Sequence, residues 1–208
     1  MNDKLKNKEF NNPFPFNNIK EQKNIIRAEY MEKRALLPEE IKNEYEQKIA
    51  NKFLNSISYR HAEIILCYYS INSEISTRYI IDTALADGKK VALPRCNTKN
   101  YTMDFHYITS TSQLEKTDAN LIEPFADLPI YENGRELAVC IVPAVVFDKA
   151  GYRVGYGKGY YDRFLHNFNG SKIGLTYSNF ILNKLPRGRY DCAVDVIITE
   201  RGIQALKI

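Results

Sequence analysis

An uninterrupted apolar run, LAVCIVPAVVF from Leu137 to Phe147, constrains the fold of this chain more than any other feature. A run without charged residues is typical of a strand that is buried on both faces of a sheet in an α/β protein. The run exceeds the usual length of a strand, and proline cannot donate a ladder hydrogen bond. We therefore predict a central buried strand whose hydrogen-bonded part ends near Pro143.

A strand–helix–strand unit is predicted earlier in the chain. Glu63–Tyr69 is a short apolar run rich in β-branched and aromatic residues, which indicates a buried strand. A helix is expected to begin after Ser76 or Thr77, and Lys90–Leu93 then forms a second strand that Pro94 should stop. Two strands joined by a helix within about thirty residues favour a parallel sheet.

The remaining segments complete a single α/β domain, expected over residues 19–208. Further strands are predicted at Met103–Ile108, Lys172–Tyr177 and Val194–Thr199, and helices from about Ile19, from Pro38 and over Gly159–Phe168. The segment up to Arg135 is expected to be a loop, and the Asn-rich residues 1–18, with two prolines, a flexible extension. The predicted fold is a mostly parallel sheet with helices on both faces.

Composition indicates a cytoplasmic protein. Four cysteines are widely spaced without a CxxC pair, which argues against a disulfide framework or a zinc cluster. No run approaches the ~18 apolar residues of a membrane helix, and the polar N-terminus lacks the apolar core of a signal peptide. The net charge of +4 is mild and excludes little.

The glycine-rich stretch FDKAGYRVGYGKGYYDRFL, Phe147 to Leu165, follows the apolar run directly. In open α/β sheets, ligands bind beyond the carboxyl ends of the strands. Glycines let the backbone approach a ligand closely, and successive backbone N–H groups bind anions. Arg153 and Lys158 add fixed positive charge, so we expect this loop to hold a phosphate. The pattern is not the GxxxxGK(S/T) of a P-loop, because Tyr160 follows Gly159 and no hydroxyl is placed to hold magnesium.

Several residues keep two interpretations at this level. Asp162 either stabilises the dipole of its helix or binds a magnesium ion that accompanies the phosphates. Lys23 and Arg27 share a helix face, which taken alone favours a solvated basic surface. The tyrosines of the loop could also stack on single-stranded nucleic acid, although the basic residues do not extend into a stripe.

The stretch IVPAVVFDKAGYRVGYGKGYYDRFL closely resembles the signature of the 5-formyltetrahydrofolate cyclo-ligase, or methenyltetrahydrofolate synthetase, family. Other matching features follow in the family's order: Lys23 and Arg27, Glu74 in YYSINSEIST, the LPR that ends at Arg95, and Leu185-Pro186 before Asp191. The resemblance covers about residues 20 to 203 and implies the fold shared by the NagB and RpiA sugar-phosphate isomerases and the coenzyme A transferases. It also implies a reaction in which 5-formyltetrahydrofolate and MgATP give 5,10-methenyltetrahydrofolate, ADP and phosphate, through phosphorylation of the formyl oxygen and attack by N10.

The resemblance also implies a role for each matching residue. ATP would be bound by Lys23, Arg27, Arg153, Gly155, Tyr156, Gly157, Lys158, Gly159, Tyr160 and Tyr161, with Arg153 and Lys158 also offsetting charge in the transition state. The folate would be bound by Tyr69, Glu74, Tyr156 and Tyr160, with Tyr69 in the formyl pocket and Glu74 accepting hydrogen bonds from the pterin. Magnesium would be bound by Asp162 and Asp191.

Two positions depart from the family pattern. Ala144 stands where a glycine is common, and Phe180 stands where a glutamine is common, so Asn179 would have to supply any contact of that glutamine. Arg95 is expected either to contact a ligand or to pair with a carboxylate.

The expected partners are small molecules, without nucleic acid or membrane, and the protein is expected to be a monomer or weak dimer. The alternatives are a nucleic-acid-binding module and a family member that binds nucleotide or folate without turnover.

Overall fold

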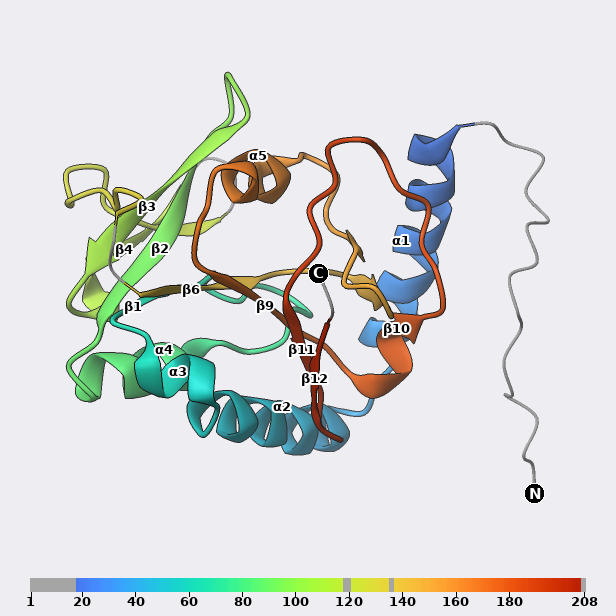
Figure 1. The fold of residues 1–208 in the computed structure, drawn as a ribbon, viewed down its shortest axis with the longest axis horizontal. Coiled ribbons are helices and arrows are strands. Elements are labelled where there is room, and N and C mark those ends of the chain that lie inside the picture. The colour runs from blue at the N-terminus through green and yellow to red at the C-terminus, as the bar shows by residue number, and fades with distance from the viewer. Residues whose placement is uncertain (1–17, 118–120, 135–136, 207–208) are drawn as a thin grey trace.

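A seven-stranded sheet forms the centre of the protein (Figure 1); the computed structural model describes residues 18–117, 121–134 and 137–206. The strands lie in the order β12-β11-β9-β6-β1-β2-β3. Their bounds are β1 Ile64–Leu66, β2 Lys90–Asn97, β3 Thr102–Ile108, β6 Ala138–Val142, β9 Ser171–Leu175, β11 Val196–Ile198 and β12 Ile203–Ala205. The run from β11 to β2 is parallel, and the edge strands β12 and β3 are antiparallel to their neighbours.

Two smaller sheets flank the main one. The first joins β10 (Ile181–Leu182), β7 (Val146–Asp148) and β8 (Arg153–Val154), and the second joins β4 (Leu114–Lys116) to β5 (Ile122–Pro124). Short 3-10 turns lie at Thr111–Gln113 and Ser178–Phe180. Because β7 and β8 directly follow β6, they carry the chain from the centre of the main sheet into the glycine-rich loop.

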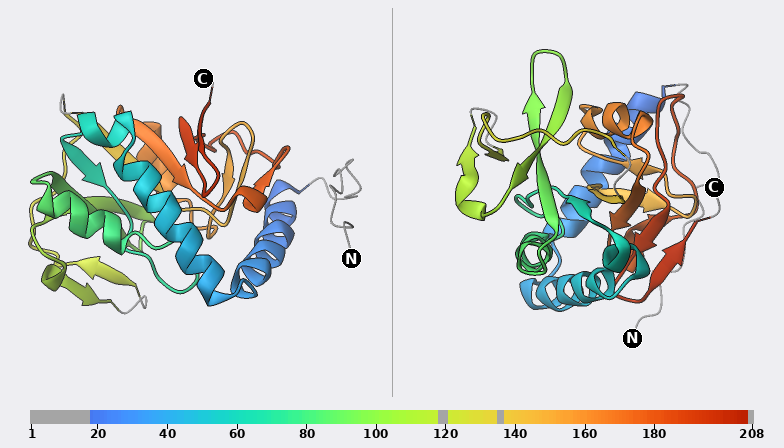
Figure 2. Two further views of the ribbon diagram at one scale, coloured as in Figure 1. Left: turned by 90° about the horizontal axis from the view of Figure 1, so that it is seen from below. Right: turned by 60° about the vertical axis from the view of Figure 1, so that its left-hand side comes forward.

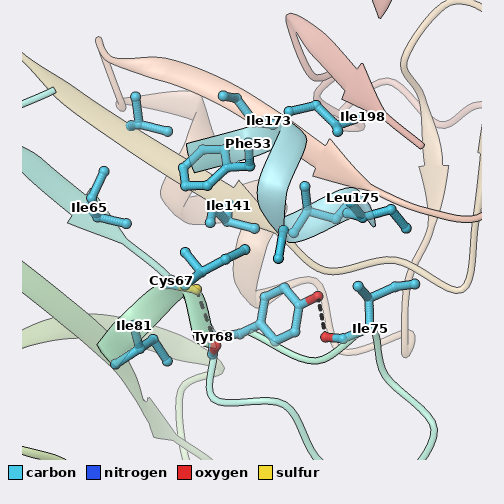
Figure 3. Packing of buried hydrophobic residues seen from close by; sticks show 14 of the residues in the cluster. Phe53, Ile65, Cys67, Tyr68, Ile75, Ile81, Ile141, Ile173, Leu175 and Ile198 are labelled. Carbon is cyan, nitrogen blue, oxygen red and sulfur yellow. Dashed lines mark hydrogen bonds between the residues drawn. The ribbon is translucent and has the colours of Figure 1, made fainter. Parts of the chain in front are cut away.

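Helices cover both faces of the main sheet, as predicted. Their bounds are α1 Ile19–Ala35, α2 Glu39–Leu54, α3 Ile57–His61, α4 Arg78–Ala86 and α5 Tyr160–His166. Side chains alternate along β1: Ile65 packs in the cluster that contains residues of α1, α2 and α4, whereas Ile64 and Leu66 pack in the cluster that contains Leu165 of α5. Figures 1 and 2 show α2, α3 and α4 on one side of the sheet and α5 on the other, and Figure 3 shows Ile65 and Phe53 of α2 among the buried side chains of the first of these clusters.

Pro94 does not end β2, contrary to the prediction. The strand continues to Asn97, with Pro94 paired to Phe105 of β3. The N–H of Cys96, two residues on and therefore on the same edge, bonds to the Glu123 side chain and points away from β3. The nitrogen of Pro94 thus faces the edge along which β1 has already ended at Leu66, where no ladder bond is lost.

Other boundaries differ in smaller ways. The segment before Arg135, predicted as a loop, contains β4 and β5, and the apolar run divides at Pro143 into β6 and β7. Residues 1–17 of the expected extension lie outside the described residues, whereas Asn18 belongs to the domain because its side chain caps α1. In the ranges given above, no helix has the length and the apolar character needed to cross a membrane.

A substitution in β9 tests how tightly side chains pack around Phe147, which belongs to the cluster that contains Leu165 of α5. A Cβ added at Gly174 would lie 2.4 Å from Cζ of Phe147, a ring that is fully buried. Gly174→Ala should therefore lower the free energy of unfolding by about 1–3 kcal/mol through overpacking, measured by urea denaturation.

Gly202→Ala is the matched control, because its Cβ would meet no atom within 4 Å. Its free energy of unfolding should stay within about 0.5 kcal/mol of the wild type. Equal stability of the two variants would contradict the packing described for Phe147.

Candidate active site

A cleft of about 1460 Å³ opens beside the carboxyl ends of the parallel strands. It is bounded by α1, the segments after β1 and β2, the glycine-rich loop, the start of α5 and the loop that contains Asp191. All the residues predicted for the site line this cleft: Lys23, Arg27, Tyr69, Glu74, Arg153, Gly155, Tyr156, Gly157, Lys158, Gly159, Tyr160, Tyr161, Asp162 and Asp191. They come from separate parts of the chain, residues 23–27, 69–74, 153–162 and 191, and the fold brings these parts together.

The glycine-rich loop runs from the end of β8 at Val154 to Gly159, which precedes α5. Gly157 and Gly159 have φ angles of 91° and 74°, a left-handed conformation that side chains rarely adopt. A Cβ at Gly157 would also lie 3.0 Å from Nη2 of Arg27, so a side chain there would displace the Arg27 guanidinium slightly, in addition to the strain of the backbone. Lys158 is exposed between them, on the wall of the cleft.

Helix α1 contacts this loop and the Asp191 loop through its two predicted cations. Arg27 donates from Nε to the carbonyl of Gly155 at 2.6 Å. Lys23 forms an ion pair with Asp191 at 2.5 Å, and each of these side chains is only 17% exposed. The solvated basic surface favoured by spacing alone is therefore wrong, because both cations face the cleft.

Arg153 and Asp162 form an ion pair at 2.9 Å. The Arg153 side chain is only 5% exposed, and its Nη1 donates to the carbonyl of Cys192. The N–H of Cys192 in turn donates to Asp162 at 3.2 Å. Asp162 thus partners a buried arginine, a role that neither sequence interpretation included, and Arg153 already binds protein atoms through both terminal nitrogens.

The two acidic residues predicted for magnesium lie close in the fold, because Cys192, which follows Asp191, bonds to Asp162. Each carboxylate gives one oxygen to a cation of the protein, Asp162 to Arg153 and Asp191 to Lys23. The described residues contain no cluster of three or more His, Cys, Asp or Glu side chains suited to a metal. A magnesium ion carried by phosphates needs only one or two carboxylates, so this donor set fits a metal that enters with a nucleotide.

The other end of the cleft carries Glu74 and Tyr156. Glu74 accepts a hydrogen bond from the N–H of Ile71 at 3.0 Å and interacts with the Tyr156 phenol. Burial raises the pKa of Glu74, while the Ile71 N–H, Tyr156 and the charge of Arg34 oppose that rise. Burial and the Glu74 carboxylate raise the pKa of Tyr156, so this end presents a carboxylate acceptor and a neutral phenol.

Aromatic side chains also line the cleft, among them Tyr69, Tyr160 and Tyr161. The Arg78 guanidinium lies 4.9 Å from the centre of the Tyr69 ring, and the Tyr160 ring lies 6.2 Å from that of Tyr101. The hydroxyl of Tyr161 is buried and has no hydrogen-bond partner within the described parts of the chain. Burial raises the pKa of Tyr161, so its phenol stays neutral on the wall of the cleft.

The sequence did not indicate the role of Arg163. Its Nη1 donates to the carbonyls of Lys158 and Tyr101, at 3.0 and 3.1 Å, and thereby ties the glycine-rich loop to the hairpin between β2 and β3. Tyr101 has a φ angle of 58°, which is uncommon for a residue with a side chain. A basic residue one position after Asp162 carries no pattern that would predict these contacts.

The positions that were uncertain from sequence now have definite surroundings. Arg95 donates to the Glu115 carboxylate at 2.8 Å and to the carbonyl of Pro124. Of its two expected roles, it therefore has the pairing with a carboxylate. Phe180 is buried against Tyr30 and Tyr177 and does not line the cleft. Asn179 is exposed and does not line the cleft either.

Comparisons with known proteins identify the family of the chain. The sequence model of the 5-formyltetrahydrofolate cyclo-ligase family matches residues 19–200. The chain is 31% identical over 179 residues to the 5-formyltetrahydrofolate cyclo-ligase of Haemophilus influenzae, covering 83% of this chain and 95% of that one. It is 28% identical over 174 residues to the Escherichia coli K12 enzyme of the same name, covering 80% and 93%.

A solved structure gives the same result for the fold. The NMR structure of 5,10-methenyltetrahydrofolate synthetase from Aquifex aeolicus superposes with a TM-score of 0.79 at 27% identity, over 89% of this chain and 93% of that one. Family match, relatives and structure cover almost the whole described chain. The chain therefore belongs to the 5-formyltetrahydrofolate cyclo-ligase family and is an enzyme that converts 5-formyltetrahydrofolate to 5,10-methenyltetrahydrofolate.

Proposed function

We propose that this enzyme transfers the γ-phosphoryl group of ATP to the formyl oxygen of 5-formyltetrahydrofolate. The observation that carries the proposal is a single cleft with two chemically different ends. One end gathers the cations Lys23, Arg27 and Lys158, and the other gathers Glu74 and tyrosines. The first suits a polyphosphate, and the second suits a heterocycle with N–H donors.

The nucleotide end is assigned to α1 and the glycine-rich loop. Lys158 is exposed on the cleft wall and would contact the transferring phosphoryl group, where developing charge is offset by a fixed cation. Arg27 braces the loop at Gly155 while its charge remains beside the same space. Arg153 contributes its charge from a fixed, buried position rather than as a mobile side chain.

The folate end is assigned to Glu74, Tyr69, Tyr156, Tyr160 and Tyr161. Glu74 would accept hydrogen bonds from the pterin amino and ring N–H groups. The unpartnered hydroxyl of Tyr161 would gain a partner on the bound folate, since a buried hydroxyl without one is unfavourable. This assignment moves Tyr161 from the nucleotide to the folate.

The reaction then proceeds in two steps. The formyl oxygen attacks the γ-phosphorus and ADP leaves, which turns an amide-like oxygen into a phosphate leaving group. N10 attacks the activated formyl carbon, its proton is lost, and phosphate departs as the ring closes. Phosphoryl transfer depends on positioning and charge neutralisation rather than on a protein nucleophile.

Magnesium would be held by Asp162 and Asp191 together with the phosphates, and it would neutralise phosphate charge there. Both carboxylates are now partnered by cations of the protein. When a magnesium nucleotide binds, the ion pair between Lys23 and Asp191 would open. Lys23 would then bind a phosphate, and Asp191 would bind the metal.

A cytoplasmic location remains part of the proposal, supported by four cysteines that are all free. The expectations of a monomer or weak dimer and of no nucleic-acid partner stay predictions.

The direct test mixes the purified protein with 5-formyltetrahydrofolate and MgATP and follows the near-ultraviolet absorbance of the methenyl product together with ADP release. Product and ADP should appear in equal amounts. A folded protein that gives no product with both substrates saturating would overturn the proposal, and product without ADP would overturn the phosphoryl-transfer step.

Lys158→Ala should lower kcat by about 100-fold or more, in the range observed when one charge-stabilising group is removed. The KM for 5-formyltetrahydrofolate should change by less than about threefold, because Lys158 is assigned to the phosphates, and removal of an interaction that forms only in the transition state leaves KM largely unchanged. Lys149→Ala, an exposed lysine outside the cleft, is the control and should behave as the wild type. Equal losses in catalysis and folate binding would contradict the phosphate role.

Asp191→Asn and Asp162→Asn should both lower turnover and raise the magnesium concentration needed for half-maximal rate. They should differ in stability, because Asp162→Asn leaves the buried Arg153 without its carboxylate and should destabilise by about 1–3 kcal/mol. Asp191→Asn should destabilise less, since Lys23 can then turn toward solvent. Steady-state kinetics against magnesium and urea denaturation check both points, and an unchanged magnesium requirement in both variants would refute the metal assignment.

A further inference from the structure

Arg34, in the last turn of α1, is a cation buried without an ion pair. Its side chain is among the largest that are fully buried, with 1% of the residue exposed, and no carboxylate lies within salt-bridge distance of it in the described part of the chain. Its Nε has no hydrogen-bond partner there. Burying a charge in this way costs several kcal/mol, so the position of Arg34 calls for an explanation beyond packing.

The contacts of Arg34 lead to the wall of the cleft. Nη2 donates to two consecutive carbonyls, those of Ala144 at 2.9 Å and Val145 at 2.5 Å, in the turn between β6 and β7. Val145 is joined to β8 through a bond from its N–H to the carbonyl of Val154. Two residues after Val154 stands Tyr156, so Arg34 fixes the backbone from which this tyrosine projects.

Arg34 also interacts directly with the end of the cleft that carries Glu74. The phenol of Tyr156 interacts with both Glu74 and Arg34 and therefore links the two charges. On its other side, the Arg34 guanidinium lies 5.6 Å from the centre of the Phe180 ring. The buried cation thus lies behind Tyr156 and Glu74, with an aromatic ring in place of a counter-ion.

We propose that Arg34 is a positioning residue for the folate-binding end of the cleft, which holds the turn after Pro143 and thereby orients Tyr156 beside Glu74 without touching the substrate. This inference rests on the proposed function, in which Glu74 accepts hydrogen bonds from the pterin. It assigns to α1 a role at each end of the cleft: Lys23 and Arg27 at the nucleotide, and Arg34 at the folate.

The charged and titratable groups that face Glu74 give this role a pH signature. They are Cys67 and Tyr68 after β1, Tyr156 in the glycine-rich loop, Tyr161 on α5 and Arg34 on α1. Burial raises the pKa of Glu74, and Arg34 is the cation among these groups that opposes the rise. Without Arg34, Glu74 should take up its proton at a higher pH and lose its capacity to accept hydrogen bonds from the pterin.

The test compares Arg34→Met and Arg34→Lys with the wild type. Arg34→Met should weaken 5-formyltetrahydrofolate binding roughly tenfold or more, as expected for lost interactions with a charged group. Nucleotide binding should change less than about threefold, because Arg34 contacts no residue assigned to the phosphates. The acid limb of kcat/KM for the folate should move to higher pH, because a cation that favours the ionised form of Glu74 has been removed.

Arg34→Lys retains the charge but not the paired donors. Its acid limb should remain near that of the wild type, and its folate binding should be intermediate. Arg60→Met, which removes an exposed arginine of α3, is the control and should match the wild type in every measurement.

If Arg34 had a merely structural role, Arg34→Met would weaken the binding of folate and of nucleotide equally and leave the pH dependence of kcat/KM unchanged. That result would overturn the proposal. If Arg34→Met does not fold, dissociation constants for Arg34→Lys decide: unchanged folate binding, or equal loss for folate and nucleotide, overturns it. Failure of the proposed function would be seen in a different measurement: the wild type would bind 5-formyltetrahydrofolate without forming the methenyl product.

Discussion

The ion pair between the buried Arg153 and the partly exposed Asp162 is the contact on which the arrangement of the site depends. Through it, β8 and α5, which enclose the glycine-rich loop, are joined to each other and to the chain at Cys192. A short loop with two glycines in the left-handed conformation has little stiffness of its own. Its shape is therefore fixed from outside, by this ion pair at its ends and by Arg27 at Gly155.

Helix α1 likewise fixes several parts of the site from outside. The helix places Lys23, Arg27 and Arg34 at successive contacts with the Asp191 loop, the glycine-rich loop and the turn after Pro143. One rigid element thus sets the distance between the two ends of the cleft. This matters for a reaction in which an oxygen of one substrate must reach the phosphorus of another, because small errors in position strongly reduce the rate of phosphoryl transfer.

Much of the fold could be predicted because its determinants are local. The sequence itself shows the apolar run before Pro143, the βαβ pattern around α4 and the helical spacing of apolar residues in the first helix. The course of β2 through Pro94 could not be predicted, since it depends on where β1 ends beside it. The β4–β5 pair was missed because two short polar strands have no distinctive pattern.

The residues of the cleft could be gathered from motifs and family resemblance, but their partners could not. Nothing in the spacing shows that Asp162 pairs with Arg153, that Asp191 pairs with Lys23, or that Phe180 lies beneath Arg34. The contacts of Lys23 and Arg34 join residues far apart in sequence and are set by the crossing of α1 over the loops, whereas Arg153 and Asp162 lie nine positions apart on either side of the glycine-rich loop. The motif gives the chemistry available at a site, whereas the tertiary structure decides which charges are free.

The hairpin of β2 and β3 has one further consequence, for behaviour in a crowded solution. Beyond Leu66 it leaves its neighbour β1 and would expose a strand edge, a surface on which another molecule could add a strand. On that edge Pro94 has no N–H, and the N–H of Cys96 is already bonded to Glu123. The edge at these two positions therefore offers no donor to an incoming strand, and the hairpin can border an open cleft without inviting aggregation.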